Sequence, residues 1–331
     1  MKIVITTGIY PPDVGGPARY AVGIENALLE QGHEVKVLSY GIEKKLPTGV
    51  RHLWFLLRVL LNTRKTDVII ALDTFSVGLP STIAGNITGT KTIIRIGGDF
   101  LWEQYTEHQI ISIKDFYGSL PKLSFKERLL RKALKYVFNH ADVLAFTTAW
   151  QRDIEQKAYE FDSEKAVVVA NYFGPKKESY SPTRKNFIWA VRPVGFKNKD
   201  RLMKAFALAR KENPEISLDT NIYPREELMQ KISECYAVIL PSVSDIGPNI
   251  IIESVEHNKP FICTKETGLF ETLKDVGRFV DPEDIEDIKD AILELANYDT
   301  YSAYKGKVER FSKEHSWGDI AKEYVTLLKN N

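Results

Sequence analysis

Two carboxylates, Asp245 and Glu253, flank a short segment that could hold a phosphate. The stretch SDIGPNIIIE, residues 244–253, follows an apolar run and enters a helix shortly after Gly247. The first amides of a helix have no partner within the helix, so an N-terminus near Asn249 favours an anionic group. The carboxylates would then accept hydrogen bonds from hydroxyl groups on two different parts of one ligand. In the alternative interpretation, Asp245 caps the helix and Glu253 lies on its surface.

Two basic residues lie in a second loop with similar potential. Arg192 and Lys197 belong to the stretch VRPVGFKNKDRL, residues 191–202, which follows another apolar run. Two cations at the end of a strand suit a diphosphate whose negative charge grows as a bond to it breaks. Lys199 and Arg201 make the whole neighbourhood basic, so a solvated charged loop is the alternative.

A pair of glycines, Gly15 and Gly16, lies in the first long loop, TGIYPPDVGGPARY, residues 7–20. Pro17 suits the first position of a helix, and glycines before it let a ligand approach the helix N-terminus closely. A glycine-rich turn without a ligand is the alternative. The loop lacks the spacing G-x-G-x-x-G, and the second apolar run ends without an acid, which argues against a nicotinamide-dinucleotide site.

Short apolar runs that alternate with amphipathic ones must position these residues. Runs that are apolar at nearly every position are typical of parallel strands covered on both faces. In the first half of the chain the strand candidates are residues 2–6, 34–40, 67–72, 91–96, 142–147 and 166–170. In the second half they are residues 187–191, 216–219, 237–241, 260–264 and 278–281. The alternation predicts an α/β fold with two parallel sheets.

The length of 331 residues suits two domains with a cleft between them. We expect an N-terminal domain over residues 1–175, a polar linker over 176–185 and a C-terminal domain over 186–312. The last segment, 313–331, contains an apolar-periodic run that predicts a helix crossing back to the N-terminal domain. Ligands of an open parallel sheet bind beyond the carboxyl ends of its strands, where the acids, cations and glycines lie.

The composition argues against several classes of function. Lys and Arg number 45 against 44 Asp and Glu, so no global field recruits nucleic acid. Cys235 and Cys263 lie in apolar surroundings and indicate buried thiols in a reducing compartment. The six histidines form no visible ligand cluster, and no run approaches the roughly 18 apolar residues of a membrane span. We therefore expect a cytoplasmic protein without a metal.

Two segments have the composition of membrane-surface helices. Residues 114–135 contain seven basic residues beside aromatic ones, and they predict either contact with anionic lipid on the inner membrane face or a solvated helix face. Residues 51–65, RHLWFLLRVLLNTRK, lie between two strand candidates, and a packed crossover helix is the favoured interpretation there.

Four stretches, GGPARY, VRPVGFK, PSVSDIGPNIIIE and TGLFETLKDVGRFVDPED, occur in this order over nearly the whole chain. Together they resemble the motifs of the family 4 retaining glycosyltransferases, which transfer a sugar from a nucleotide diphosphate. The resemblance implies two facing Rossmann-like domains with a cleft between them, the GT-B fold. It implies a nucleotide-sugar donor on the C-terminal domain, an acceptor on the N-terminal domain, no cofactor and no metal.

The resemblance also implies roles for the matching residues. Arg192 and Lys197 would hold the diphosphate, Asp245 would grip the transferred sugar, and Glu253 would grip the ribose diol. The implied donor-binding residues are Gly15, Gly16, Arg192, Lys197, Asp245, Gly247, Asn249, Ile250 and Glu253. Arg192, Lys197 and Asp245 would also act in catalysis. The acceptor would attack on the face from which the leaving group departs, and a donor phosphate oxygen would help to take the proton.

The sequence departs from the family pattern near the reacting carbon. Asp245 stands where the family usually has Glu, so contacts with the sugar differ. The family often has a histidine after the fourth strand, but that stretch here reads RIGGDFLWE, which leaves Asp99 as the catalytic candidate. Asp73 and Tyr20 are further candidates on the acceptor side.

The region for the nucleotide base also departs from the pattern. Residues 212–230 are shorter than the corresponding family region, and Tyr223 is the candidate there for stacking on a base. The expected function is transfer of a hexose or N-acetylhexosamine, from a UDP, GDP or ADP conjugate, to a glycan or lipid-linked acceptor. The alternatives are a sugar-nucleotide epimerase or hydrolase of the same fold, and a catalytically silent binding or scaffold protein.

Overall fold

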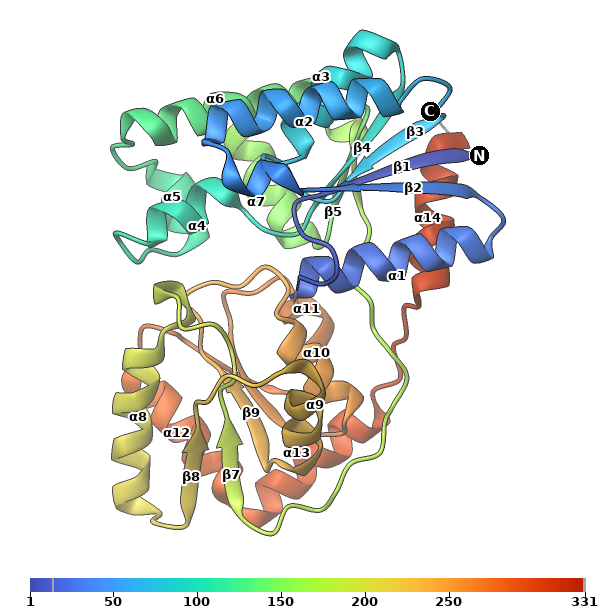
Figure 1. The fold of residues 1–331 in the computed structure, drawn as a ribbon. Helices are drawn as coiled ribbons and strands as arrows, with labels where there is room; N and C mark the ends of the chain where they lie inside the picture. The colour runs from blue at the N-terminus through green and yellow to red at the C-terminus, as the bar shows by residue number, and fades with distance from the viewer. Residues whose placement is uncertain (14, 330–331) are drawn as a thin grey trace. The chain divides into compact units, whose positions relative to one another are not determined.

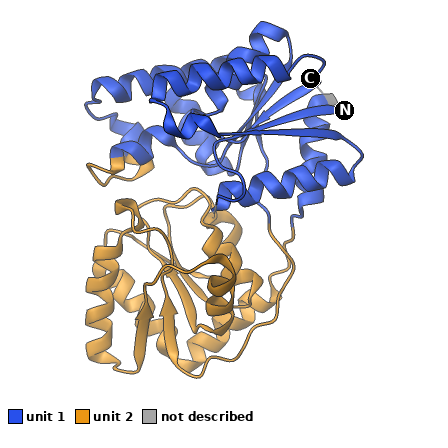
Figure 2. Cartoon of the chain, viewed as in Figure 1, with its two compact units in different colours: residues 1–105, 116–172, 315–331 blue, residues 106–115, 173–314 orange. Residues whose placement is uncertain are grey.

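The computed structural model describes residues 1–13 and 15–329, which divide into two compact α/β units (Figures 1 and 2). Unit 1 comprises residues 1–105, 116–172 and 315–331, and unit 2 comprises residues 106–115 and 173–314. The expected boundaries did not anticipate that residues 106–115 group with the second unit. Each unit is described separately below.

Unit 1 is built on one parallel sheet of six strands in the order β2-β1-β3-β4-β5-β6. Its strands are β1 Lys2–Thr7, β2 Glu34–Ser39, β3 Val68–Ala71, β4 Lys91–Ile96, β5 Val143–Phe146 and β6 Ala166–Val168. The order reverses between β1 and β3, which makes their carboxyl ends the switch point of a doubly wound sheet. Each predicted strand of this half is present, because burial on both faces requires nearly continuous apolar sequence.

Helices cover both faces of the sheet of unit 1 (Figure 1). They are α1 Gly16–Glu30, α2 Thr48–Asn62, α3 Gly78–Thr88, α4 Phe100–Thr106, α5 Ile113–Ser119, α6 Phe125–His140, α7 Ala149–Tyr159 and α14 Trp317–Lys329, with 3-10 turns at Ile42–Lys45 and Ser163–Lys165. On one face α14 packs against α1, where the edge of the Trp317 ring meets Tyr20. A side chain at Gly23 would overlap this ring, so α14 needs glycine there.

Unit 2 repeats the same topology with five parallel strands in the order β11-β10-β9-β7-β8. Its strands are β7 Lys185–Ile188, β8 Ile216–Asp219, β9 Ala237–Leu240, β10 Phe261–Thr264 and β11 Arg278–Val280. Its helices are α8 Lys199–Glu212, α9 Arg225–Glu234, α10 Asn249–Glu256, α11 Phe270–Leu273, α12 Ile285–Ala296 and α13 Tyr298–Arg310, with a 3-10 turn at Gly195–Lys197. The switch point of this sheet lies between β7 and β9.

The segment expected to be a free linker, residues 176–185, is bound to unit 2. Lys177 forms an ion pair with the buried carboxylate of Glu256, and the Lys176 ammonium donates to the carbonyl oxygens of Val255 and Val308. The Lys259 ammonium donates to the carbonyl of Tyr180 at 2.6 Å. Because the buried Glu256 carboxylate and the buried Lys259 ammonium each need a partner, these contacts hold the segment along unit 2.

Candidate functional site

The switch point of unit 2 gathers the loops that carry most of the predicted site residues. The loop after β7 contains Arg192 and Lys197, and the loop after β9 leads through Asp245 into α10. Backbone contact joins the two loops, because the amide of Val243 donates to the carbonyl of Phe196 at 2.8 Å. Strand order, which the sequence does not display, therefore brings these two distant stretches to one sheet edge.

Asn198 holds this edge together and was not singled out in the sequence. Its side-chain amide donates to the carbonyl oxygens of Pro241 at 2.8 Å and Pro282 at 2.7 Å, so it ties the loop after β7 to those after β9 and β11. Its backbone is left-handed, with φ of 62°. Asparagine tolerates that conformation better than most residues, and this tolerance is the only signal for its role in the sequence.

Lys197 and Asp245 form an ion pair with each other. The Lys197 ammonium lies 2.5 Å from Asp245 Oδ2, and both side chains are mostly buried. The hydroxyl of Ser242 also donates to Asp245 at 3.3 Å. The Asp245 backbone pairs with the loop after β10, where its amide donates to the carbonyl of Glu266 at 2.9 Å. The acid is therefore fixed by its own loop and two others.

Arg192 differs from Lys197 in being exposed at this edge. Within residues 1–13 and 15–329, its side chain has no ion-pair or hydrogen-bond partner. The backbone around it is ordered by a turn in which the amide of Val194 donates to the Arg192 carbonyl at 2.8 Å. An arginine whose backbone is ordered and whose guanidinium is exposed can bind an anion through two parallel hydrogen bonds, in bidentate geometry.

The helix after the loop of Asp245, α10, begins at Asn249 with Pro248 as the residue before it. Asp245 is therefore not its cap, contrary to the alternative interpretation of the sequence. Ile250 is buried, which anchors the first turn, while Asn249 is exposed. The first amides of the helix precede its first internal hydrogen bond and are available to an anion.

Glu253 lies inside unit 2 rather than on its surface, with 4% of its side chain exposed. Its carboxylate forms an ion pair with Arg225, the first residue of α9. No local pattern predicts this partner, because Arg225 lies 28 residues away in a polar segment. A buried carboxylate needs such a partner, since an unpaired charge is costly to bury.

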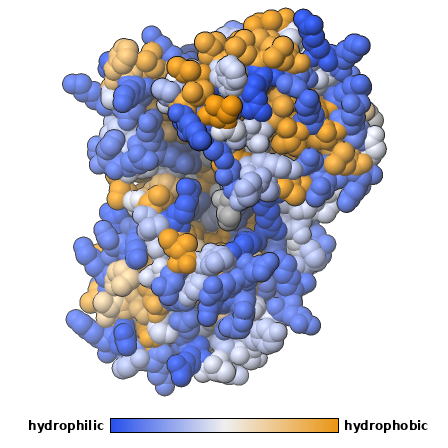
Figure 3. Space-filling view, in the orientation of Figure 1, coloured by the Kyte–Doolittle hydropathy of each residue, from blue (hydrophilic) through white to orange (hydrophobic). Residues whose placement is uncertain are grey.

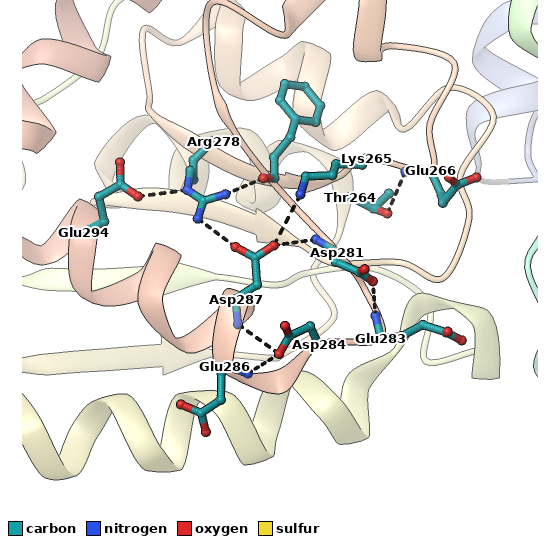
Figure 4. Close-up of polar contacts among 11 residues, drawn as sticks. Thr264, Lys265, Glu266, Arg278, Asp281, Glu283, Asp284, Glu286, Asp287 and Glu294 are labelled. Atoms are coloured by element: carbon teal, nitrogen blue, oxygen red, sulfur yellow. Dashed lines mark hydrogen bonds and ion pairs between the residues drawn. The ribbon is translucent and has the colours of Figure 1, made fainter.

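A separate charged cluster beside this edge is fully engaged in structural contacts (Figure 4). The Arg278 guanidinium donates to Glu294 at 2.8 Å and to Asp287 at 2.7 Å. Lys265 lies 3.6 Å from Asp287, which also accepts from the amide of Asp281. These contacts fix β11 to α12, so this arginine is engaged in holding the scaffold.

Residues 106–115 contact the same loops of unit 2. The amide of Ile113 donates to the Ser244 hydroxyl at 3.1 Å, and Lys114 lies 2.9 Å from Glu266. A side chain on Gly195 would come within 3.3 Å of Ile110. Lys114, the first basic residue of the stretch 114–135, is thus engaged in an ion pair within unit 2.

The basic stretch of residues 114–135 covers two helices rather than one. It contains α5 and α6 with a loop between them, and Phe116 is completely buried. The aromatic side chain that faces solvent is Phe125, with 67% exposed. Most of the basic residues of the stretch lie on α6, and contact of this helix with anionic lipid stays a prediction.

The glycine pair in unit 1 lies at the start of α1. Gly15 has a φ of 147°, a conformation that favours glycine, and Gly16 is the first helical residue. The first turn of α1 has no acidic side chain that would occupy its amides. This geometry leaves the N-terminus of α1 open to an anionic group, as the sequence indicated.

Asp73 lies at the switch point of unit 1, directly after β3. Its carboxylate accepts from the amide of Val77 at 3.0 Å, and its Oδ2 atom lies 3.6 Å from where a side chain on Gly8 would begin. Burial raises the pKa of the Asp73 carboxyl to about 6, although hydrogen bonds from backbone amides oppose the shift. The loops after β1 and β3 therefore meet at a buried carboxyl group whose pKa is raised.

Asp99, which follows β4, is 4% exposed and belongs to a buried polar cluster. It accepts from the amide of Trp102 at 2.8 Å and from the Tyr117 hydroxyl at 2.5 Å. Glu155 also lies beside it, and burial raises the pKa of both carboxyls. Repulsion between them raises the pKa of Glu155 further, so the pair retains a proton at a pH where ordinary carboxyls are ionised.

The two tyrosine candidates, Tyr20 and Tyr223, both contact other side chains of the protein through their hydroxyl groups. Tyr20 is 5% exposed, its hydroxyl lies 3.0 Å from that of Tyr324, and the Arg95 guanidinium lies 3.7 Å from its ring centre. It belongs to the core between α1 and α14, and its role on the acceptor side stays a prediction. Tyr223 is half-buried in unit 2 and donates to Asp219 at 2.6 Å, which leaves its role in stacking a prediction.

The two cysteines are free and buried, as expected. Burial raises the pKa of the Cys235 thiol to about 12. Among the described residues, no group of three or more histidine, cysteine, aspartate or glutamate side chains could hold a metal ion. In the same part of the chain, no helix has both the length and the apolar character to cross a bilayer.

Comparison with known structures supports the architecture. Sucrose-phosphate synthase from Thermosynechococcus elongatus superposes with a TM-score of 0.74 at 13% identity, covering 99% of this chain and 98% of that one. HepE from Anabaena in complex with UDP-glucose gives 0.70 at 14% identity, covering 100% of both chains. WaaG, a glycosyltransferase involved in lipopolysaccharide biosynthesis, gives 0.69 at 12%, covering 99% and 100%. This chain has the GT-B fold.

Sequence comparison agrees with this GT-B assignment. An uncharacterized glycosyltransferase from Haemophilus influenzae is 21% identical over 95% of this chain and 96% of its own length. No protein-family model matches the chain. The predicted fold class, two Rossmann-like domains with parallel sheets, is confirmed, and so is the resemblance to GT-B glycosyltransferases.

Proposed function

We propose that this chain is a retaining glycosyltransferase that moves a hexosyl or N-acetylhexosaminyl group from a nucleotide diphosphate sugar to a glycan or lipid-linked acceptor. The proposal rests on one observation. At the switch point of unit 2, Arg192 and Lys197 lie on the loop after β7, and Lys197 pairs with Asp245 on the loop after β9, which leads into α10, the helix that contains Glu253. Structures of the similar HepE contain UDP-glucose or UDP, which supports a nucleotide-sugar donor.

The proposed chemistry needs positive charge where the leaving diphosphate forms. Arg192 offers an exposed guanidinium, and the amides of α10 offer hydrogen-bond donors. Lys197 is paired with Asp245 before a donor binds, so we propose that a donor phosphate shares this ammonium while Asp245 accepts from sugar hydroxyl groups. Glu253 would accept from the ribose diol. These interactions together supply charge stabilisation without a metal.

On the acceptor side we propose Asp73 and Asp99. Both are carboxyl groups whose pKa is raised by burial, and each follows a strand of unit 1. The exposed basic residues of α6, among them Lys126 and Lys132, lie on the same helix as the exposed Phe125 and support contact with an anionic acceptor or surface.

The test is a thermal-shift series of the purified chain with UDP, GDP, ADP and their sugar conjugates, repeated with Arg192→Ala. A matched control is Arg210→Ala, because Arg210 is an exposed arginine of the same unit in the last turn of α8. Ligand at 100 times its dissociation constant adds about 2.7 kcal/mol to apparent stability. We expect a shift with one nucleotide family that is lost in Arg192→Ala and retained in Arg210→Ala.

Transfer must then be separated from binding alone. The Lys197–Asp245 ion pair is also compatible with a protein that binds a nucleotide sugar but does not transfer it. In that case Asp245, the proposed sugar-binding acid, would keep Lys197 as its partner. Turnover of the donor that requires an acceptor supports the transferase, and turnover without an acceptor supports an epimerase or hydrolase. A shift without turnover supports a silent binding protein, and no shift with any nucleotide contradicts the proposal.

A further inference from the structure

Helix α2 presents an apolar face to solvent. Two of its side chains, Phe55 and Val59, are buried, whereas apolar side chains on its outer side are between 46% and 78% exposed. These exposed residues, called here the α2 apolar face, are Val50, Leu53, Trp54, Leu57 and Leu61. Their spacing of three, four, seven and eleven residues places them along one side of the helix.

The sequence favoured a packed crossover helix for this stretch, and the structure confirms only part of that interpretation. The helix does connect β2 to β3 and packs against α3. Its outer side nevertheless stays uncovered in unit 1, and hydrophobic residues gather over it in the space-filling view (Figure 3). Single exposed apolar residues are ordinary on proteins, but a contiguous stripe that includes tryptophan marks an interaction surface.

The charge around this face identifies the kind of partner. From residue 44 to residue 65 the sequence contains six basic residues and no acidic one: Lys44, Lys45, Arg51, Arg58, Arg64 and Lys65. Lys44 pairs with Asp13 and Arg58 with Glu43, while Lys45, Arg64 and Lys65 are exposed. An apolar stripe flanked by cations is the composition of a helix that lies in the interface of an anionic bilayer.

We propose that the α2 apolar face docks this chain on an anionic lipid bilayer. The leucines and Trp54 would enter the boundary between headgroups and acyl chains, and the exposed cations would contact lipid phosphates. A second copy of the chain is the less favoured occupant. Two-fold pairing of α2 with itself would place the same basic residues opposite one another, with no acid in the stretch to compensate.

The docked helix is connected to the acceptor side of unit 1. The His52 ring of α2 lies 4.6 Å from the ring of Phe75, which belongs to the loop after β3 that begins with Asp73. Docking through α2 would therefore bring the loop of a proposed acceptor residue near the lipid surface. This corollary, a lipid-linked acceptor, rests on the proposed function, whereas the docking itself does not.

The experiment is co-sedimentation of the full chain with vesicles of phosphatidylglycerol and phosphatidylethanolamine, without any nucleotide. We expect binding that weakens with salt and with phosphatidylcholine vesicles. Leu57→Ser combined with Leu61→Ser should weaken binding at least about tenfold, because each leucine loses much of its transfer free energy. Both residues are exposed, so the variant should fold as the parent does. The matched control is Ile222→Ser, a residue of unit 2 that is 65% exposed.

A second measurement reports the depth of the face directly. Trp54 fluorescence should shift to the blue on adding the vesicles, and Trp54→Phe should abolish the shift while retaining binding. Equal binding of the leucine variant and the parent would overturn the proposal, as would loss of binding in the Ile222→Ser control. Self-association that the leucine substitutions abolish, without vesicle binding, would also overturn it and assign the face to a second copy. Because no nucleotide is present, failure here is distinct from failure of the proposed transfer reaction.

Discussion

Replacing Asn198 should destabilise unit 2 more than its position in a surface loop suggests. The side-chain amide of Asn198 supplies the hydrogen bonds to the carbonyl oxygens of Pro241 and Pro282, and the residue is 5% exposed. Each buried acceptor left without a donor costs about 1–3 kcal/mol. The left-handed backbone costs alanine about 1 kcal/mol more than asparagine. Asn198→Ala should therefore lower the free energy of unfolding by about 3–7 kcal/mol.

Asn198→Gly separates the two contributions. Glycine adopts a φ of 62° without strain but has no side-chain donor. It should therefore cost about 2–6 kcal/mol, or roughly 1 kcal/mol less than alanine. If alanine and glycine are equally harmful, the backbone part of the argument fails.

Hydrogen exchange is the suitable assay, because it reports the opening of each unit separately. Amides of β9 should exchange faster in both variants, and amides of β1 in unit 1 should not change. The same variants should weaken nucleotide binding, since Asn198 joins the loop of Lys197 to the loop that leads to Asp245. A loss below about 1 kcal/mol in Asn198→Ala would refute the account of this residue as the tie between three loops.

Two further predictions concern unit 1. A side chain on Gly23 would come within 2.4 Å of the Trp317 ring, so Gly23→Ala should cost about 1–3 kcal/mol and speed hydrogen exchange in α14. The control Gly49→Ala meets nothing within 4 Å and should stabilise α2 by about 0.5–1 kcal/mol, and similar effects of the two would contradict this reasoning. The folded-state pKa of Asp73, about 6, lies above its unfolded value, so its ionisation destabilises the fold as pH rises from about 4 to about 6. Asp73→Asn should therefore match the parent near pH 4 and be about 2–3 kcal/mol more stable at pH 7 in urea unfolding, whereas a gain independent of pH would argue against the shifted pKa.

The sequence was most informative where a single local rule dominates. Parallel strands buried on both faces must be apolar at almost every position, which is why runs such as residues 67–72 and 237–241 correspond closely to β3 and β9. The start of α1 could also be predicted from its glycines, because few residues other than glycine adopt the φ of 147° found at Gly15. The motifs around Arg192 and Glu253 indicated their loop and helix correctly, since both depend on neighbours in sequence.

The sequence was least informative about which side chains meet. Tyr20 was assigned to an acceptor site, yet it packs against α14, about three hundred residues later in the chain. Glu253 and Arg225 form an ion pair that no local sequence pattern predicts. Residues 176–185 read as a linker because they are polar, although their lysines bind carbonyl and carboxylate groups of unit 2.

The sequence by itself determined the strands, the helix starts and the two-domain α/β class, because burial on both faces of a strand and the conformational limits of glycine and proline act within a few residues. Tertiary structure alone decided that Lys197 faces Asp245 and that Asn198 ties three loops together. It also decided that the outer side of α2 remains exposed. Such pairings depend on strand order and helix packing, where residues far apart in the chain compete for the same partners.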